Sequence, residues 1–476
     1  MEESKTLDIK GAVKWSAFAE IIAKLIAPIT SIILARLLTP EAFGIVASVT
    51  MVTSFCDLFT DVGCNKYIIQ HTFKDDIDLS NNASVAFWTN IMISFVFWIS
   101  IFILRSQISS YIGLDGEPWA IVIASLSLIM TAFSSVQVAI MRKELNFKKL
   151  FRIRLVVTLT TLVVSAGFAL AGAGFWALIV GNLARDLINA LLFTYYSIWR
   201  PSFYYSIKNL YSMLSFSAFA LVETLVTWMK VNISILILTA TLTSYLLGLY
   251  KTAITIDNSI IGLLYSSIVP VLYSALSKVK NDIQSFRNIL FRMQKLMAML
   301  AFPIGMIIFV YHDLVTKLLL GSQWGEVAAF LGLYGLALVV ENVFCIFCVE
   351  AYRAAGKPLY SAISVGLNAL CLGVSLWFVR YESFDIICEV TLLNSVIYYF
   401  VQMIIMKIVL SISPFAMLNN VRTCICITGI IGLVSYLSVS LFVFNQIAMA
   451  IISGLSYIGV LVIIPSTRVE IKKMLK

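Results

Sequence analysis

Apolar runs of about 20 residues recur along this 476-residue chain almost from end to end. A run of that length is what an α-helix needs to cross the hydrocarbon core of a bilayer, which is about 30 Å thick. Only helices and closed barrels satisfy their backbone hydrogen bonds in lipid, and these runs lack the two-residue alternation of barrel strands. The chain is 60% hydrophobic and only 12% charged, whereas soluble proteins average about 25% charged residues. We therefore expect an all-α, polytopic membrane protein.

The pattern predicts about fourteen membrane spans, with short connections that leave no room for a sizeable soluble domain. The spans lie near residues 12–36, 43–68, 83–104, 119–141, 153–172, 175–198, 213–240, 245–272, 295–320, 326–351, 358–379, 384–406, 422–443 and 447–465. The residues before the first span are polar, and that span is long and lacks a small-residue cleavage site. No cleavable signal peptide is expected.

The basic residues predict the orientation of the chain. With a cytoplasmic N-terminus, most of the 34 lysines and arginines fall in segments on the cytoplasmic side, and only Arg36, Arg105, Lys317 and Arg380 fall in outer segments. This is the positive-inside distribution, and an even number of spans puts both termini in the cytoplasm. The net charge of +9 is then mainly a topology signal, so a nucleic-acid partner is not expected. The basic loop 142–154 could also contact anionic headgroups, but we favour orientation alone.

A segment near the first predicted hairpin recurs later in the chain. Ile33–Ser48 (ILARLLTPEAFGIVAS) aligns with Ile237–Thr252 (ILTATLTSYLLGLYKT) at a constant offset. The matching pairs are Ile33/Ile237, Leu34/Leu238, Leu38/Leu242, Thr39/Thr243 and Gly44/Gly248. Each copy joins the first two spans of a six-span half, so the halves share orientation and an axis along the membrane normal would relate them. We expect an N-terminal bundle at 1–205, a C-terminal bundle at 206–410, and two further helices with a tail at 411–476.

The first copy of the repeat contains a tight turn on the outer side. Pro40 suits the first position of the next helix, where its missing N–H costs nothing. Thr39 can cap that helix, and Glu41 suits its positive N-terminal end.

Several ionisable residues lie deep in predicted spans, where each costs about 2.5 to 3.5 kcal/mol on insertion scales. Such residues usually face a cavity and a partner. Four cations are the candidate substrate-binding residues of a central cavity: Lys24, Lys230, Lys251 and Arg185. Six acids are candidates for ion coupling or for pairing with those cations: Glu20, Asp57, Asp61, Glu223, Asp257 and Glu341. Helical spacing puts Lys251 on the same face as Thr255 and Asn258, and puts Asp257 on another.

Two interpretations of these charges stay open. They are either structural ion pairs that hold helices together, or the lining of a polar cavity for an anionic ligand. The acid and lysine on the first helix of both halves favour the cavity, and lysine ammonium groups are suitable partners for an anion. Trp15, Trp228 and Tyr265 are weaker candidates for stacking on sugars.

The first hairpin also resembles a known family. ARLLTPEAFGIVA at 35–47 is similar to the first-hairpin signature of bacterial polysaccharide-export proteins, the Wzx-type flippases of the multidrug/oligosaccharidyl-lipid/polysaccharide superfamily, and above all of the colanic acid and teichuronic acid exporters. Weaker similarities follow in order across residues 10–410: TDVGCNKYIIQ at 60–70, PVLYSALSK at 270–278, LLLGSQWGEVAAFLGLYGLA at 318–337 and EAYRAAGKPLY at 350–360.

The resemblance implies two six-helix bundles that face each other across a central cavity. It implies transport of an undecaprenyl-pyrophosphate-linked oligosaccharide from the cytoplasmic to the periplasmic leaflet of the bacterial inner membrane, for O-antigen, exopolysaccharide or capsule synthesis. The partners would be this lipid-linked substrate, membrane lipids and other polysaccharide assembly proteins. No cofactor is expected, only a coupling H⁺ or Na⁺.

Two other classes of function remain as alternatives. A multidrug antiporter of the same superfamily should have a net acidic cavity, whereas the four candidate cations argue for an anionic substrate. A polysaccharide polymerase or ligase should have a large outer loop, and the outer loops here are short. No P-loop, GxSxG or HExxH motif occurs, so enzyme activity is not expected. The eight scattered cysteines and two histidines do not predict a metal site.

Overall fold

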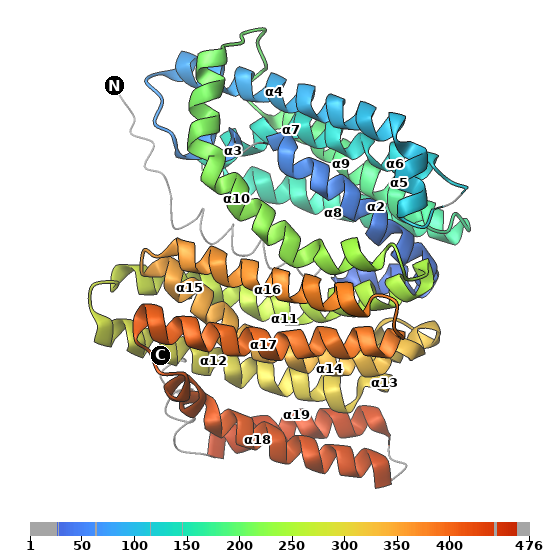
Figure 1. Cartoon of the computed structure of the whole chain (residues 1–476), viewed down its shortest axis with the longest axis vertical. Coiled ribbons are helices and arrows are strands. Elements are labelled where there is room, and N and C mark those ends of the chain that lie inside the picture. The colour runs from blue at the N-terminus through green and yellow to red at the C-terminus, as the bar shows by residue number, and fades with distance from the viewer. Residues whose placement is uncertain are drawn as a thin grey trace. The chain divides into compact units, whose positions relative to one another are not determined.

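The computed structural model describes residues 26, 28–61, 64–114, 116–144, 146–441 and 445–463. Every regular element in these residues is helical (Figure 1). Twelve of the described helices are long and apolar enough to cross a membrane, and two shorter apolar helices, Pro28–Leu37 and Gln446–Leu461, lie within the first and last predicted spans. The all-α membrane fold is confirmed, whereas the count of fourteen spans and the two-bundle arrangement stay predictions.

The chain divides into two compact units, residues 1–248 and 249–476. Within the first unit, α9 packs against α7 and α8, α4 packs against α7, and α10 lies on α2. The predicted domain bounds at 205 and 410 stay predictions. The described helices of this unit are α2 (Pro40–Asp61), α3 (Cys64–Gln70), α4 (Asp76–Ile103), α5 (Arg105–Tyr111), α6 (Trp119–Ala124), α7 (Leu126–Lys143), α8 (Phe147–Leu170), α9 (Trp176–Tyr196), α10 (Ile207–Leu238) and the first turn of α11 (Ser244–Lys278).

The second unit contains the rest of α11 and a core built around α12. This core joins residues of α11, α12, α14, α15, α17, α18 and α19. Besides α11, the described elements of the second unit are α12 (Ile283–Val310), α13 (His312–Leu319), η1 (Ser322–Val327), α14 (Ala328–Val340), η2 (Glu341–Cys345), α15 (Ile346–Ala354), α16 (Pro358–Val379), α17 (Phe384–Leu410), α18 (Pro414–Leu441) and α19 (Gln446–Ile463).

Two helices begin with residues that helix N-termini prefer. The helix α2 begins at Pro40. At the entry to α12, the Asp282 carboxylate accepts hydrogen bonds from the backbone amides of Gln284 and Ser285. Bonds from Ser285 and Gln284 hold the pKa of this exposed carboxyl below its usual value. Such caps satisfy amides that the helix itself leaves without partners.

Large apolar side chains lie exposed along the spans. On α8, Val163 and Leu170 are 68% and 75% exposed. A soluble protein would not present such a surface to water, but in a bilayer these side chains contact lipid tails.

The two glycines matched by the sequence repeat lie against each other. A Cβ on Gly44 would come within 1.8 Å of the Ser244 carbonyl oxygen, and a Cβ on Gly248 would come within 1.8 Å of the Pro40 carbonyl oxygen. The contact is reciprocal, because each glycine faces the residue four positions before the other. Only glycine permits this approach of the first turns of α2 and α11.

Two spans depart from a regular α-helix. The predicted span 119–141 contains a break at Ser125, between α6 and α7. The predicted span 326–351 contains a single π-helical turn, η2, which starts at Glu341. Turns of this kind are rare and frequently occur at functional sites.

Candidate functional site

The structure describes most of the predicted site residues but not all of them. Glu20 and Lys24 lie outside the described residues. Asp61 is the last residue of α2, and its side chain also lies outside the described part of the structure. The predicted pairing of Glu20 with Lys24 therefore stays a prediction.

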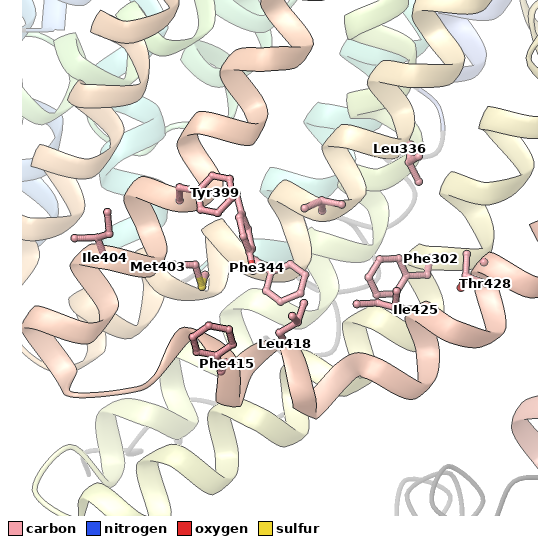
Figure 2. A pocket seen from close by; sticks show the side chains of 13 residues that line it. Phe302, Leu336, Phe344, Tyr399, Met403, Ile404, Phe415, Leu418, Ile425 and Thr428 are labelled. Carbon is pink, nitrogen blue, oxygen red and sulfur yellow. The ribbon is translucent and has the colours of Figure 1, made fainter.

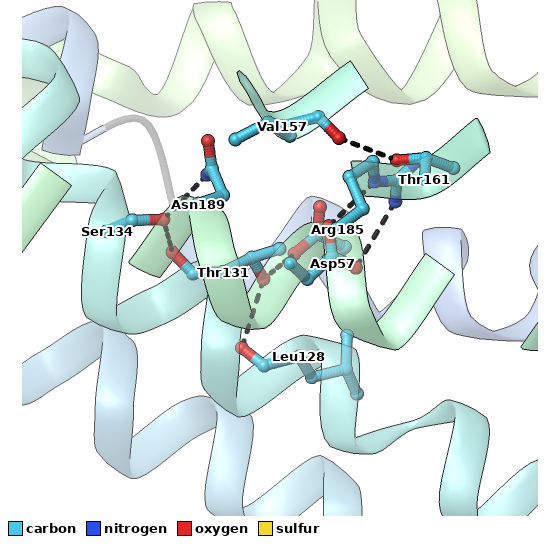
Figure 3. A network of polar contacts seen from close by, with 9 residues as sticks. Asp57, Leu128, Thr131, Ser134, Val157, Thr161, Arg185 and Asn189 are labelled. Carbon is cyan, nitrogen blue, oxygen red and sulfur yellow. Dashed lines mark hydrogen bonds and ion pairs between the residues drawn. The ribbon is translucent and has the colours of Figure 1, made fainter. Parts of the chain in front are cut away.

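Asp57 belongs to a polar network inside the first unit (Figure 3). Its Oδ1 accepts a hydrogen bond of 3.0 Å from the Thr60 hydroxyl, one turn on along α2, and one of 3.2 Å from the Thr131 hydroxyl of α7. The carboxylate also lies within electrostatic range of Arg185 and Asp186 on α9. Asp57 is nevertheless exposed. Hydrogen bonds therefore fix its carboxylate in position, and the residue remains accessible to a ligand.

Arg185 and Asp186 form a two-bond ion pair within this network. Arg185 Nε donates to Asp186 Oδ1 at 2.9 Å, and its Nη2 donates to Oδ2 at 3.2 Å. The Asp186 side chain is 8% exposed, whereas that of Arg185 is 46% exposed. The pair thus has a buried anion and an accessible cation, and the guanidinium keeps donors free to face a ligand because only some of its five N–H groups are used.

Further along the same helices, the Asn189 amide of α9 donates to the Ser134 hydroxyl of α7 at 3.2 Å. Ser134 in turn donates to the carbonyl oxygen of Thr131 at 3.2 Å. Together with the bond from Thr131 to Asp57, these contacts connect α2, α7 and α9. We call the set the Asp57–Arg185 network; its members are Asp57, Thr60, Thr131, Ser134, Arg185, Asp186 and Asn189.

Sequence reasoning selected Asp57 and Arg185 of this network and missed its uncharged members. Thr131 and Ser134 are three residues apart on α7, and Arg185 and Asn189 are four apart on α9. In the sequence, this spacing indicates that the two residues of each pair lie on one face of their helix. Short Ser and Thr side chains are common in membrane helices, so spacing alone does not show which of them pair.

The helix α10 carries two predicted site residues beside an aromatic contact. The Glu223 carboxylate lies 4.0 Å from the Lys66 ammonium, with both side chains at least 40% exposed. Such an open pair is weak. Lys230 is half-buried on the same helix. Trp228 donates from Nε1 to the Ser54 hydroxyl at 3.0 Å and packs on Phe55, so it contributes to packing between α10 and α2.

The second unit holds the remaining three predicted residues. Lys251 is half-buried on α11, and Asn258 is exposed, whereas Asp257 is fully buried. The structure thus separates Asp257 from the Lys251 face. Glu341 is half-buried at the start of the π-helical turn. No hydrogen bond is found for either carboxylate oxygen of Asp257 among the described residues.

The second unit also has a large apolar cavity between α12, α14, η2, α17 and α18 (Figure 2). Its volume is about 790 Å³. Phe344 and Tyr399 meet edge to face at 5.2 Å in its wall, and Phe415 lies across from them in Figure 2. Thr428 and the Tyr399 hydroxyl are the polar groups among the lining side chains. The cavity therefore suits a hydrocarbon chain.

The cysteines do not form a metal site in the described residues. All eight are free thiols, and no group of three or more His, Cys, Asp or Glu residues in the described part of the chain has the arrangement of a metal site.

The comparisons with known proteins agree with the resemblance found in the sequence. A family model described as polysaccharide biosynthesis protein matches residues 33–329. The chain is 26% identical to the lipopolysaccharide biosynthesis protein WzxC of Escherichia coli strain K12 over 365 residues, which cover 75% of this chain and 69% of WzxC.

Two solved structures share the fold. The lipid II flippase MurJ, in an inward closed conformation, superposes with a TM-score of 0.74 at 13% identity, over 94% of this chain and 98% of that one. An inward-facing multidrug resistance transporter of the MATE family superposes with a TM-score of 0.65 at 14% identity, over 84% of this chain and 98% of that one.

The family match and these relatives confirm the resemblance to Wzx-type exporters and the prediction of a transporter rather than an enzyme. The twelve described apolar helices agree with a multi-pass protein of the inner membrane. Because the family model covers more than half of its length, the chain belongs to the polysaccharide biosynthesis protein family.

Proposed function

We propose that this protein is a flippase that moves undecaprenyl-pyrophosphate-linked oligosaccharides from the cytoplasmic to the periplasmic leaflet. The family match over residues 33–329 carries the proposal, and the fold shared with a protein named lipid II flippase supports it. Both termini lie in the cytoplasm in this proposal. The cycle is alternating access, with no cofactor and with an ion gradient as the energy source.

The pyrophosphate headgroup of the substrate is proposed to bind to arginine and lysine side chains within the spans. Arg185 supports this role, because its partner Asp186 is buried while the guanidinium itself is accessible. A guanidinium fork matches phosphate oxygens, and Lys24, Lys230 and Lys251 would add ammonium groups. Asp57 would help to hold Arg185 in place between substrates, because it lies within electrostatic range of it.

The prenyl chain is proposed to use the apolar cavity of the second unit. The cavity is lined almost wholly by aliphatic and aromatic side chains, as in Figure 2. Burial of hydrocarbon there contributes about 0.8 kcal/mol per CH₂ relative to water, but little relative to lipid. The cavity would thus orient the chain rather than supply affinity.

A reconstituted assay tests the proposal. Vesicles would contain an undecaprenyl-pyrophosphate-linked oligosaccharide labelled on the sugar, and a membrane-impermeant quencher would report the outer leaflet. The protein should make the label of the inner leaflet accessible, and Arg185→Ala, Lys230→Ala and Lys251→Ala should lose this activity. Arg154→Ala, an exposed cation at the start of α8, is the matched control and should behave as wild type.

Two results would contradict the proposal. One is quenching no faster than in vesicles without protein. The other is transport of cationic drugs in the same vesicles, which would favour the multidrug antiporter that shares the fold.

A further inference from the structure

Asp257 differs from Asp57, Asp186 and Glu350 in having no hydrogen-bond or ion-pair partner among the described residues. It lies near the middle of α11 and is 0% exposed. Neither Oδ1 nor Oδ2 has a hydrogen-bond partner in the structure. By contrast, Asp57 accepts two hydroxyl bonds, and Asp186 and Glu350 are ion-paired with Arg185 and Arg353.

The surroundings of Asp257 are apolar and tight. A Cβ added to Gly335 of α14 would lie 3.2 Å from Asp257 Oδ1 and 2.8 Å from Cγ2 of Ile308 on α12. The carboxyl group therefore sits against the α14 backbone, in space that exists only because residue 335 is glycine. The Asp257 side chain is not exposed to solvent at this point.

Among the described residues, the stretches of α12 and α14 that lie close to Asp257 are uncharged. The helix α14 contains no charged residue, and Tyr334 is its one titratable group. The stretch 297–310 of α12 is also uncharged. His312 of α13 lies against Gly332, one turn from Gly335, but its Nδ1 faces Asp313 at 3.3 Å.

The helix α17 also packs on α11, where the Tyr250 hydroxyl bonds to the Thr391 hydroxyl at 3.1 Å. The charged residues of α17 are Asp385 and Glu389, before Thr391, and Lys407, near the other end of the helix. On α11 itself the charged residues besides Asp257 are Lys251, on another face, and Lys278 at the C-terminus.

Burial of an ionised carboxylate in such a site would cost several kcal/mol of free energy. No hydrogen-bond partner among the described residues offsets this cost. A sodium ion could offset the charge only if several oxygen ligands replaced its hydration shell, whereas no described hydroxyl or amide hydrogen-bonds to Asp257. A proton needs no further ligand. It converts the carboxylate into a neutral acid that an apolar site tolerates.

We propose that Asp257 is the proton-carrying residue of this transporter, neutral in the conformation seen here and ionised when α11 and α14 separate. The proposal rests on the proposed transport function and names its coupling ion. In each cycle the carboxylate takes one proton from water on one side of the membrane, and the acid releases that proton on the other.

Infrared spectroscopy of the purified protein tests the protonation directly, without transport. A protonated carboxylic acid has a C=O stretch apart from the bands of carboxylates and amides. Wild type should show this band at neutral pH and Asp257→Asn should lose it, while the matched control Asp282→Asn, an exposed cap outside the spans, should retain it. Gly335→Ala, which crowds Oδ1, should shift the band without removing it. A wild type without the band, or a band unchanged in Asp257→Asn, overturns the proposal.

A second measurement separates this inference from the proposed function. Undecaprenyl pyrophosphate would be added to the protein in lipid nanodiscs, and binding and proton release would be recorded together. Wild type should bind the lipid and release protons, whereas Asp257→Asn should bind and release none. Equal release from both proteins contradicts the role of Asp257 and leaves the flippase proposal intact. If wild type does not bind the lipid, the proposed function fails, and the infrared band still decides the protonation of Asp257.

Discussion

Two buried acids, Asp186 in the first unit and Asp257 in the second, have opposite surroundings. In the first unit, Asp186 is nearly buried but bonded twice to Arg185, and Asp57 accepts two hydroxyl bonds. In the second unit, Asp257 is fully buried and has no hydrogen-bond partner among the described residues. A paired acid stays ionised and positions a cation, whereas an isolated acid in an apolar site is stable only as the neutral form. We propose from this comparison that Arg185 of the first unit takes part in anion recognition and that Asp257 of the second unit binds the coupling proton.

The largest effect is expected from removal of the Arg185 side chain. Arg185→Ala leaves Asp186 charged and buried, which should lower the free energy of unfolding by about 3 kcal/mol. Thermal unfolding in detergent measures this loss. The double variant Arg185→Leu with Asp186→Leu should regain most of the stability but not polysaccharide export. Export restored in that double variant would mean that the pair is only structural.

The same substitution should act differently in the two units. Asp186→Asn removes a charge that accepts two bonds from Arg185, so it should destabilise the protein by about 1.5 to 3 kcal/mol. Asp257→Asn breaks no bond to a partner and replaces a neutral acid by a neutral amide of similar shape, so the loss of stability should be smaller than for Asp186→Asn. Unfolding curves of both variants check the contrast. Equal losses would contradict the difference between the units.

The tight contact around Asp257 gives a smaller effect. Gly335→Ala puts a methyl group against Ile308 and Asp257 and should cost about 1 to 2 kcal/mol by overpacking. The matched control is Gly167→Ala on α8, where no atom lies within 4 Å of the added Cβ. It should be neutral or slightly stabilising, because alanine is the better helix former. Similar unfolding temperatures for the two variants would mean that Gly335 has more room than described.

The smallest effect concerns one hydrogen bond of the Asp57–Arg185 network. Thr131→Val removes the hydroxyl that donates to Asp57 but keeps the side-chain shape. Since Asp57 is accessible and keeps Thr60, the expected loss is about 0.5 to 1 kcal/mol. A chemical denaturation series measures it. A loss as large as that of Arg185→Ala would mean that Thr131, rather than the ion pair, holds the network together.

Much of the fold could be predicted from the sequence, because a bilayer leaves few alternatives for apolar runs of this length. The start of α2 at Pro40 and the match of Gly44 with Gly248 were also visible in the sequence. The break at Ser125 and the π-helical turn at Glu341 were not. Both are small changes in backbone register that depend on how neighbouring helices pack.

The candidate site was predictable as a set of residue types but not as a set of contacts. An ionisable residue in a span signals a function by its cost alone, so Arg185 and Asp257 could be selected. Which of them has a partner depends on contacts between helices distant in the sequence. Thr131 lies 74 residues from Asp57, and Gly335 lies far along the chain from Asp257. No local pattern encodes either contact.

Transport under imposed ion gradients is the most direct test of the account. Labelled undecaprenyl-pyrophosphate-linked oligosaccharide would be followed in vesicles with either a pH gradient or a sodium gradient. We expect the pH gradient to accelerate transport by wild type, the sodium gradient to have no effect, and Asp257→Asn to be insensitive to both. Acceleration by sodium, or an Asp257→Asn variant that still responds to the pH gradient, would contradict the proposal that Asp257 carries the coupling proton.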